Sequence, residues 1–223
     1  MKSKNFNKKT FFSVVTVVKN DENNIQRTLI SVLNQEFKNF EYIIIDGQSK
    51  DKTLTIIDQY KKDISHIISE PDSGIYFAMN KGANLANGEF LVFVNSGDIL
   101  TKKALLIIHD KINQNPKIDF IFGTVKRHYT KDTILKFGFD KKKLFYNFDF
   151  ATSHSTGFYI RNSIFKKIGL FNTKYKCSAD YDIYYKSIII YNLAGSSTEK
   201  HELIGEVSSG GFSSTISPFE HII

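Results

Sequence analysis

The sequence contains one cysteine, three prolines and no tryptophan among its 223 residues. The single thiol, Cys177, excludes an internal disulfide and is too isolated to build a thiolate metal site, so the chain fits a reducing cytoplasm. Long apolar runs are also missing. Phe11–Val18 and Phe90–Val94 are strand-sized, which excludes a membrane-spanning helix within these residues. No apolar core or small-residue cleavage site follows the basic N-terminus, so we expect no secretory signal.

Positive charge is the one strong bias in an otherwise ordinary composition. Hydrophobic residues make up 41% and charged residues 24%, as in a single globular domain. The net charge is +7, and it equals the four lysines of residues 1–10 plus Lys141–Lys143, so the rest of the chain is balanced. Two such clusters suit anionic lipid head groups or an anionic substrate, and a solvated lysine face that serves solubility is the alternative.

Short apolar segments alternate with helical patterns in the first half of the chain. We expect strands at Phe11–Val18, Glu41–Ile45, Ile64–Ser69 and Phe90–Val94, with helices at Ile25–Phe37, Leu54–Tyr60 and Ile75–Leu85 between them. This alternation predicts an α/β fold with a twisted, mostly parallel central sheet flanked by helices. Further on, the pattern predicts helices at Leu100–Ile112 and Asp180–Tyr191, an apolar segment at Phe120–Val125, and loops at Ser196–Thr198 and Ser208–Ser214.

Polar residues follow the predicted strands directly. The loops Lys19–Asn24, Asp46–Lys50 and Asn95–Asp98 should line one crevice, because α/β sheets bind ligands at the carboxyl ends of their strands. Their carboxylates and amides suit a hard divalent cation, or the ribose and base of a nucleotide. The alternative is that each Asp or Asn merely caps a turn.

Several ordered blocks carry a family resemblance. The blocks are Val14–Asn20, Thr28–Gln35, Glu41–Thr53, Glu70–Tyr76, Met79–Gly82, Ala86–Glu89 and Asn95–Asp98. Together they resemble the family 2 glycosyltransferases of the GT-A fold, and bacterial enzymes that build surface polysaccharides. The resemblance runs from about Phe12 to at least Asp182 and implies a Rossmann-like single domain. Within that domain it implies a basic tail (1–10), a nucleotide-sugar-binding half (11–100) and an acceptor-binding half (101–223).

The resemblance also implies a donor and a cofactor. Such enzymes use a nucleotide-diphosphate sugar, most often a UDP-sugar, together with Mn²⁺ or Mg²⁺. Asp46 corresponds to the residue that contacts the uracil, Thr16, Val17 and Asn20 would flank the nucleotide, and Asp72 would close over it.

The metal motif departs from the family pattern. The family carries Asp-x-Asp at the end of the fourth strand, whereas this chain reads Asn95-Ser96-Gly97-Asp98. Asparagine replaces the first Asp and glycine stands at the usual metal-ligand position. We assign Asn95 to the ribose and Asp98 to the metal. The departure also raises the alternative of a non-catalytic family member.

Acceptor-side residues are implied further along the chain. Inverting transfer needs a base that removes the proton of the acceptor hydroxyl. Asp180 corresponds to that base and Asp182 is its rival, while His154 lies in an acceptor-side loop. The alternatives are that Asp180 caps the following helix and that His154 is an ordinary loop residue. Gly210–Ser214 resembles the glycine-rich loop that the family carries late in its sequence and that covers the donor. Because the chain stops soon after this loop, we expect that a C-terminal segment is absent from it.

Competing functions lack their signatures. A retaining glycosyltransferase would need additional site residues on the second side of the sugar, and nothing in the sequence marks them. A nucleotidyltransferase would need a glycine-rich phosphate loop after the first strand, whereas Val17–Asp21 contains no glycine. A nucleic-acid-binding protein would align its lysines with aromatics along one element, and we expect no nucleic-acid partner. We expect a nucleotide-sugar donor and a glycan or lipid-linked acceptor. We also expect the lysine clusters to contact the inner face of the membrane, where a lipid-linked acceptor would lie. The sequence leaves the sugar, the acceptor and the oligomeric state open.

Overall fold

The predicted parallel sheet is present in the computed structural model, which describes residues 9–129, 131–147 and 154–208. Its strands are β1 (Phe12–Val18), β2 (Phe40–Asp46), β3 (His66–Ser69), β4 (Phe90–Phe93), β6 (Phe120–Phe122), β9 (Phe158–Arg161) and β10 (Gly195–Ser197). These seven strands lie in the order β10-β6-β9-β4-β1-β2-β3. β1 pairs in parallel with β2 and β4, while β9 runs antiparallel to β4 and β6. The single-domain α/β prediction is thereby confirmed.

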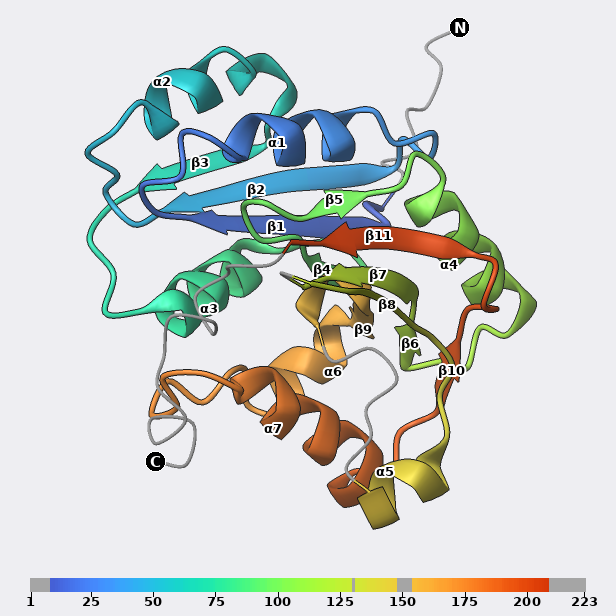
Figure 1. Ribbon diagram of the computed structural model, residues 1–223. Coiled ribbons are helices and arrows are strands. Elements are labelled where there is room, and N and C mark those ends of the chain that lie inside the picture. The colour runs from blue at the N-terminus through green and yellow to red at the C-terminus, as the bar shows by residue number, and fades with distance from the viewer. Residues whose placement is uncertain (1–8, 130, 148–153, 209–223) are drawn as a thin grey trace, which may run out of the picture.

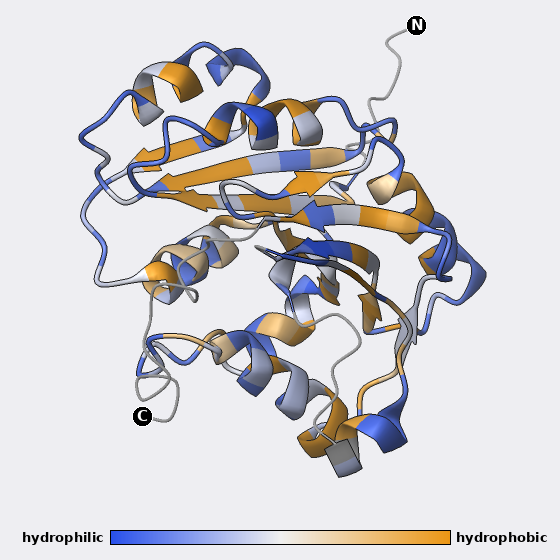
Figure 2. Cartoon of the chain, viewed as in Figure 1, coloured by the Kyte–Doolittle hydropathy of each residue, from blue (hydrophilic) through white to orange (hydrophobic). Residues whose placement is uncertain are grey.

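Helices cover both faces of this sheet (Figure 1). One face carries α1 (Ile25–Leu33), α2 (Thr53–Asp58) and α4 (Ala104–Gln114), and the other carries α3 (Ile75–Leu85), α6 (Asn162–Lys167) and α7 (Ala179–Tyr185). Strand β1 supplies both cores, since Val14 packs with α1 and Val15 with α3. Figure 2 shows the central strands as hydrophobic along much of their length, as expected of strands buried on both faces. No helix in the described ranges is both long and apolar enough to cross a bilayer.

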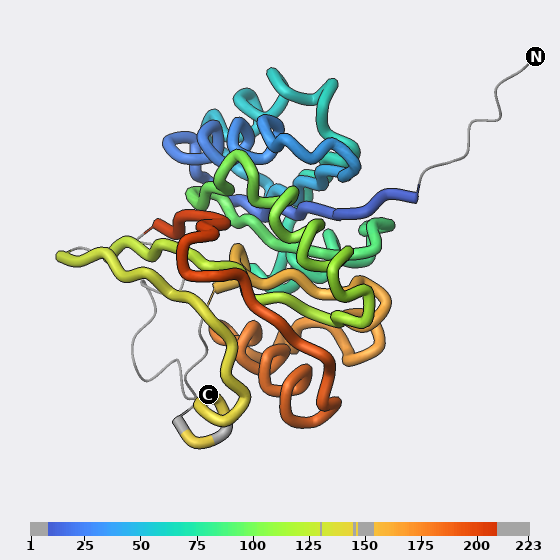
Figure 3. Tube along the Cα trace, turned by 90° about the vertical axis from the view of Figure 1, so that its right-hand side faces the viewer, coloured from blue at the N-terminus to red at the C-terminus, as the bar shows by residue number. Residues whose placement is uncertain are grey.

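A second, smaller sheet lies against the first. Its strands are β5 (Ile99–Leu100), β7 (Thr124–His128), β8 (Thr133–Lys136) and β11 (Leu203–Val207), in the order β5-β11-β7-β8. Figure 3 shows the β7–β8 hairpin projecting from the body of the molecule. Because β11 pairs with both β5 and β7, this sheet brings the segment after β4 next to residues more than a hundred positions later.

Several predicted boundaries differ from the structure, among them the end of the first helix, which is Leu33 where Phe37 was expected. The helix expected at Leu100–Ile112 begins at Ala104, because Ile99 and Leu100 pair with β11. The loop expected at Ser196–Thr198 is largely strand β10, which pairs with β6. The helix expected at Asp180–Tyr191 is α7 followed by a π-helical segment, η3 (Lys186–Ile190). At β5 and β10, backbone pairing with a distant strand decides the structure, and local composition does not report it.

Gly88 is required by close packing against β1. A Cβ at this position would lie 2.5 Å from the Ser13 nitrogen and 2.6 Å from the Phe12 carbonyl carbon. Both are backbone atoms of a central strand and cannot move aside easily. We therefore expect Gly88→Ala to lower the free energy of unfolding by about 1–3 kcal/mol in urea denaturation. The exposed helix position Asn84→Ala is the control and should change it by less than about 0.5 kcal/mol. Equal effects of the two substitutions would contradict this account.

Candidate active site

A cleft of about 1640 Å³ opens at the carboxyl ends of β1 and β4. Its walls come from the loop after β1, the start of α3, the turn after β4, the end of β7 and the start of α7. Seven of the predicted site residues line it: Val17, Asn20, Asp72, Asn95, Asp98, His154 and Asp180. Thr16, Asp46 and Asp182 do not. The fold thus brings carboxylates and amides from both halves of the chain to one cavity.

The donor-side wall is held by hydrogen bonds between neighbouring loops. Asn20 adopts a left-handed backbone with φ 50, which Asn tolerates better than most residues. Its Oδ1 accepts a hydrogen bond from the Lys50 nitrogen at 2.7 Å, and its own nitrogen donates to Ser49 Oγ at 2.8 Å. Asp72 Oδ1 accepts from the nitrogen of Gly74, whose φ of 138 favours glycine. Both side chains therefore shape the wall that they line.

Asp46 and Thr16 lie behind this wall. Both are fully buried, and neither lines the cleft. The Asp46 carboxylate accepts hydrogen bonds from the nitrogen and hydroxyl of Ser49 and, at 2.6 Å, from Ser69 Oγ. Thr16 Oγ1 donates to the Val94 carbonyl at 2.7 Å. The structure thus gives these two residues protein partners, where we expected contact with the nucleotide. The loop Asp46–Lys50 was also expected in the crevice. It does not line the cleft, but Ser49 and Lys50 hydrogen-bond to Asn20 in the loop after β1.

Asp98 lies at the junction of three segments. It is 5% exposed, and its Oδ2 accepts a hydrogen bond from Thr156 Oγ1 at 2.6 Å. The same oxygen lies 3.4 Å from His154 Nδ1, and Oδ1 accepts from the Ser208 nitrogen at 3.3 Å. A carboxylate offers about four lone-pair sites, so these contacts leave Asp98 able to bind a further partner.

Asn95 presents an unsatisfied acceptor beside Asp98. Its Nδ2 donates to Ser155 Oγ at 3.3 Å, whereas its Oδ1 is buried without a hydrogen-bond donor among the described residues. A buried carbonyl oxygen without a donor costs about 1–3 kcal/mol. Such an atom in the wall of a cleft is typical of a group that a ligand satisfies.

The residues at this turn suit a divalent cation only in part. Within the described ranges, no three His, Cys, Asp or Glu side chains converge in a metal-binding group. Mg²⁺ and Mn²⁺, however, take oxygen ligands, and Mg²⁺ is commonly held by one or two carboxylates plus substrate phosphates. The Asp98 carboxylate and the free Asn95 Oδ1 supply oxygens of that kind. This donor set fits a cation whose coordination a diphosphate completes.

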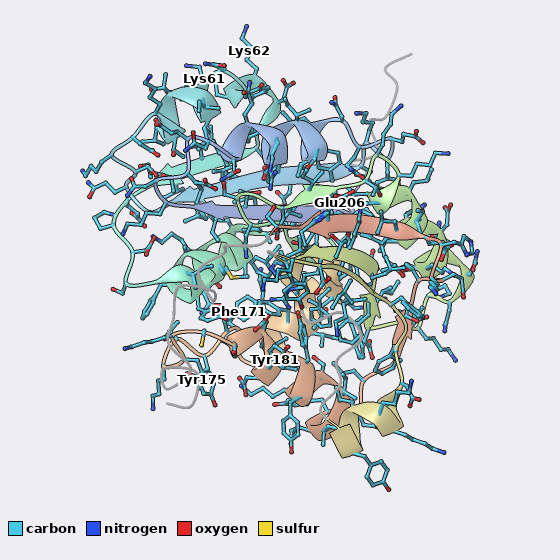
Figure 4. The ribbon with its side chains drawn as sticks, viewed as in Figure 1. Lys61, Lys62, Phe171, Tyr175, Tyr181 and Glu206 are labelled. Atoms are coloured by element: carbon cyan, nitrogen blue, oxygen red, sulfur yellow. The ribbon has the colours of Figure 1, made fainter. Side chains whose placement is uncertain are left out.

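Asp180 stands on the acceptor-side wall, in the first turn of α7. The cap position belongs to Ser178, whose φ is 67, so Asp180 is not the N-cap of this helix. Burial raises the pKa of the Asp180 carboxyl above its ordinary value of 3.8, and the charges of His154 and Arg127 oppose that rise. The adjacent residue, Tyr181, is labelled in Figure 4. A carboxylate with a raised pKa in a cleft is a candidate general base.

Asp182 faces a different partner. Its Oδ2 lies 2.7 Å from Lys186 Nζ, one helical turn further on, and it does not line the cleft. An ion pair of this kind on a helix surface stabilises the helix by a few tenths of a kcal/mol. The structure therefore separates the two rival carboxylates, since only Asp180 reaches the cavity.

Cationic side chains also line the cleft, and the sequence analysis assigned a role to none of them. They are Lys19, Arg27 and Arg127. Arg27 Nη2 donates to the Gly97 carbonyl and to Ser208 Oγ, which ties the Asn95–Asp98 turn to the segment after β11. Lys19 belongs to the loop Lys19–Asn24, which was expected in the crevice. Arg127 could not be placed there from the sequence, because only the pairing of β7 with β11 brings it here.

Comparison with known proteins identifies the family. Residues 13–169 match the family model described as glycosyl transferase family 2. The chain belongs to this family. Among curated relatives, a Mycobacterium bovis protein named PGL/p-HBAD biosynthesis glycosyltransferase is 29% identical over 177 residues, covering 77% of this chain and 67% of the relative. An uncharacterized glycosyltransferase of Rickettsia typhi is 26% identical over 196 residues, covering 78% of this chain and 57% of that protein.

Solved structures confirm the GT-A fold of this family 2 member. The crystal structure of S. aureus TarS 1-349 in complex with UDP-GlcNAc matches with a TM-score of 0.78 at 20% identity, covering 93% of this chain and 61% of that one. The mannosyltransferase PcManGT from Pyrobaculum calidifontis, in complex with GDP-Man and Mn²⁺, matches with a TM-score of 0.68 at 14% identity, covering 92% and 59%. The chain thus spans about three-fifths of the length of these solved chains.

Proposed function

We propose that this chain is an inverting glycosyltransferase that moves a sugar from a nucleotide-diphosphate sugar, a UDP-sugar, to a glycan or lipid-linked acceptor in polysaccharide synthesis. The observation that carries the proposal is one cleft with two chemically distinct walls. One wall holds Asp98 and the unsatisfied Asn95 Oδ1, and the other holds Asp180 with a raised pKa. The complex of TarS with UDP-GlcNAc supports the choice of donor.

The arrangement assigns a role to each wall. Asp180 accepts the proton of the acceptor hydroxyl while that oxygen attacks the anomeric carbon and the bond to the diphosphate breaks. Asn95 accepts a hydrogen bond from the donor, and Lys19 and Arg127 face the negative charge of the diphosphate. Asp98 would hold a divalent cation, which would neutralise charge on the departing diphosphate. His154 lies 3.4 Å from Asp98 and lowers the pKa of Asp180, so it connects the two walls.

The donor can be identified by its effect on thermal stability. A ligand that binds only the folded chain raises its melting temperature, with a gain of about 2.7 kcal/mol at a hundredfold excess over Kd. We expect UDP-sugars with Mn²⁺ to raise it more than GDP- or dTDP-sugars do. Release of UDP with an acceptor, and the anomeric configuration of the product by NMR, then test transfer and inversion. The absence of a shift with every nucleotide sugar would contradict the proposal.

Tyr76 is expected to position the base. Its hydroxyl accepts a hydrogen bond at 3.0 Å from the nitrogen of Ala179, the residue before Asp180. Tyr76→Phe removes this acceptor and leaves a buried N–H unpaired, which costs about 1–3 kcal/mol. We expect kcat to fall roughly 5- to 50-fold while KM for the donor changes little. Phe77→Leu, at an exposed position of the same helix, is the control. A higher KM at unchanged kcat would show that Tyr76 serves donor binding instead.

A further inference from the structure

Helix α5 (Lys141–Asn147) and the end of η3 form an exposed patch with both basic and apolar side chains. We define this α5–η3 patch by Lys141–Lys143, Tyr146, Ile190 and Tyr191. All three lysines are exposed, and the exposed fractions are 78% for Tyr146, 60% for Ile190 and 45% for Tyr191. Lys141 Nζ donates to Asn192 Oδ1, which joins the two elements. Figure 1 shows them side by side at the lower end of the molecule.

The patch is attached to the hydrophobic core through one residue of each element. Leu144 of α5 is 3% exposed and belongs to the same hydrophobic cluster as Ile188 of η3. The exposed side chains are therefore displayed on a packed support. Single exposed apolar side chains are ordinary, but Tyr146, Ile190 and Tyr191 are gathered beside three lysines, and an apolar group rimmed by polar residues is typical of an interaction site.

We propose that the α5–η3 patch docks the protein onto an anionic lipid bilayer. Tyrosine rings favour the interface between head groups and acyl chains, and an isoleucine side chain can enter the acyl boundary. Lysines bury their methylene stems and keep their ammonium groups among the lipid phosphates. In the described part of the chain no ion pair involves Lys141–Lys143, and the nearby Asp140 accepts only backbone hydrogen bonds from Lys142 and Lys143.

Charge favours a membrane over a second copy of this chain. A two-fold symmetric contact would place one Lys141–Lys143 cluster against the other, and that repulsion opposes dimerisation through this face. The same cluster supplies three of the seven net positive charges of the chain, and the remainder equals the lysines of residues 1–10. A surface of negative charge is therefore the matching partner.

The position of the patch suits a lipid-linked acceptor, a step that rests on the proposed function. α7 has seven residues and η3 has five, and they follow each other without a break from the cleft to the patch. At about 1.5 Å per residue this path is roughly 18 Å long. A bilayer contacted at Ile190 and Tyr191 would thus hold Asp180 just beyond the head groups, where a saccharide on a lipid carrier protrudes.

Vesicle sedimentation of the full chain tests the docking surface. We expect binding to phosphatidylcholine vesicles enriched in phosphatidylglycerol, and little binding to phosphatidylcholine alone. Replacing Lys141, Lys142 and Lys143 by Gln should lower the partition coefficient roughly 10- to 100-fold. The matched control replaces Lys52, Lys61 and Lys62 by Gln, which are exposed on the far side of the molecule. Figure 4 labels Lys61 and Lys62 there, at the end opposite α5.

Two further experiments separate membrane docking from dimerisation through the patch and from sugar transfer. Tyr146→Ser with Ile190→Ser should weaken binding without removing charge, and an unchanged melting temperature shows that each variant is folded. Equal vesicle binding by both lysine variants, no binding by the unaltered chain, or a dimer lost on patch substitution would overturn the proposal. Release of nucleotide diphosphate from the nucleotide sugar is measured in parallel with a soluble glycan acceptor and with a lipid-linked one: its absence with both refutes the proposed function and leaves the docking surface standing.

Discussion

Asp180→Asn should lower kcat for sugar transfer by about 100- to 10,000-fold, the range that a positioned general base contributes. The amide cannot accept the proton of the acceptor hydroxyl, but it keeps the shape of the carboxylate. Donor affinity, measured by calorimetry, should stay within about twofold, because Asp180 comes from α7, whereas Asp98 and Asn95 come from the turn after β4. Asp182→Asn is the matched control: that carboxylate pairs with Lys186 outside the cleft, and its loss should leave kcat nearly unchanged.

The pH dependence follows from the same carboxyl. Because burial raises the pKa of Asp180 above 3.8, kcat/KM should rise with pH through an ionisation above that value. Burial raises the pKa values of the neighbouring Tyr76 and Tyr184, and the charge of Asp180 adds to that rise, while His154 and Arg127 oppose the shift of Asp180 itself. The acid limb should disappear in Asp180→Asn and persist in Asp182→Asn.

Thermal stability distinguishes a catalytic base from a residue that only supports helix α7. A folded-state pKa above the unfolded value means that this carboxyl contributes stability below about pH 3.8, and that the contribution is lost as the pH rises through the folded pKa. At neutral pH, Asp180→Asn should therefore keep or raise the melting temperature while turnover falls. A lower melting temperature with full transfer activity would show that Asp180 supports the helix and that the base lies elsewhere.

The sheet could be predicted because its central strands are buried on both faces. Such strands read as continuous apolar runs, and each end of β1, β2 and β4 was placed to within one residue on that basis. Strand β10 could not be, since Gly195–Ser197 carries no apolar signal and is a strand only because β6 offers its edge. The small sheet was missed for the same reason: β5 contains just two residues and depends on β11.

The site was predictable where a residue follows its strand directly. Asp98 and Asn95 come after β4, so sequence order alone sends them to the cleft. Asp46 also follows a strand, yet the serines at positions 49 and 69 take up its carboxylate behind the wall. Sequence order determines the edge of the sheet at which a side chain emerges. It does not determine whether neighbouring side chains hydrogen-bond to it and keep it out of the cleft.

The contact of Asp46 with a base remains a prediction, as do the other ligand contacts. The late glycine loop, Gly210–Ser214, lies outside the described residues.

Asp98→Asn should abolish the metal dependence of donor binding. In the unaltered chain with Mn²⁺, we expect a chelator to weaken donor affinity about 10- to 100-fold, because the diphosphate loses the cation that it shares with Asp98. In Asp98→Asn, affinity should already be that low, and the chelator should change it little. Calorimetry measures the donor-binding free energy of each protein with Mn²⁺ and with chelator. The difference between the two chelator effects isolates the contribution of the contact between Asp98 and the metal.

Asp98 also has a structural role, and a second variant separates it. Thr156→Val removes the hydroxyl that donates to Asp98 Oδ2 but keeps the carboxylate, so it should lower the melting temperature and retain the chelator effect. If both variants lost metal dependence equally, the orientation of the carboxylate would be the controlling factor. If neither changed it, and the unaltered chain bound donor equally with and without chelator, Asp98 would not be a metal ligand. Donor binding would then depend on Lys19, Arg127 and Asn95, which would make this chain a metal-independent member of its family.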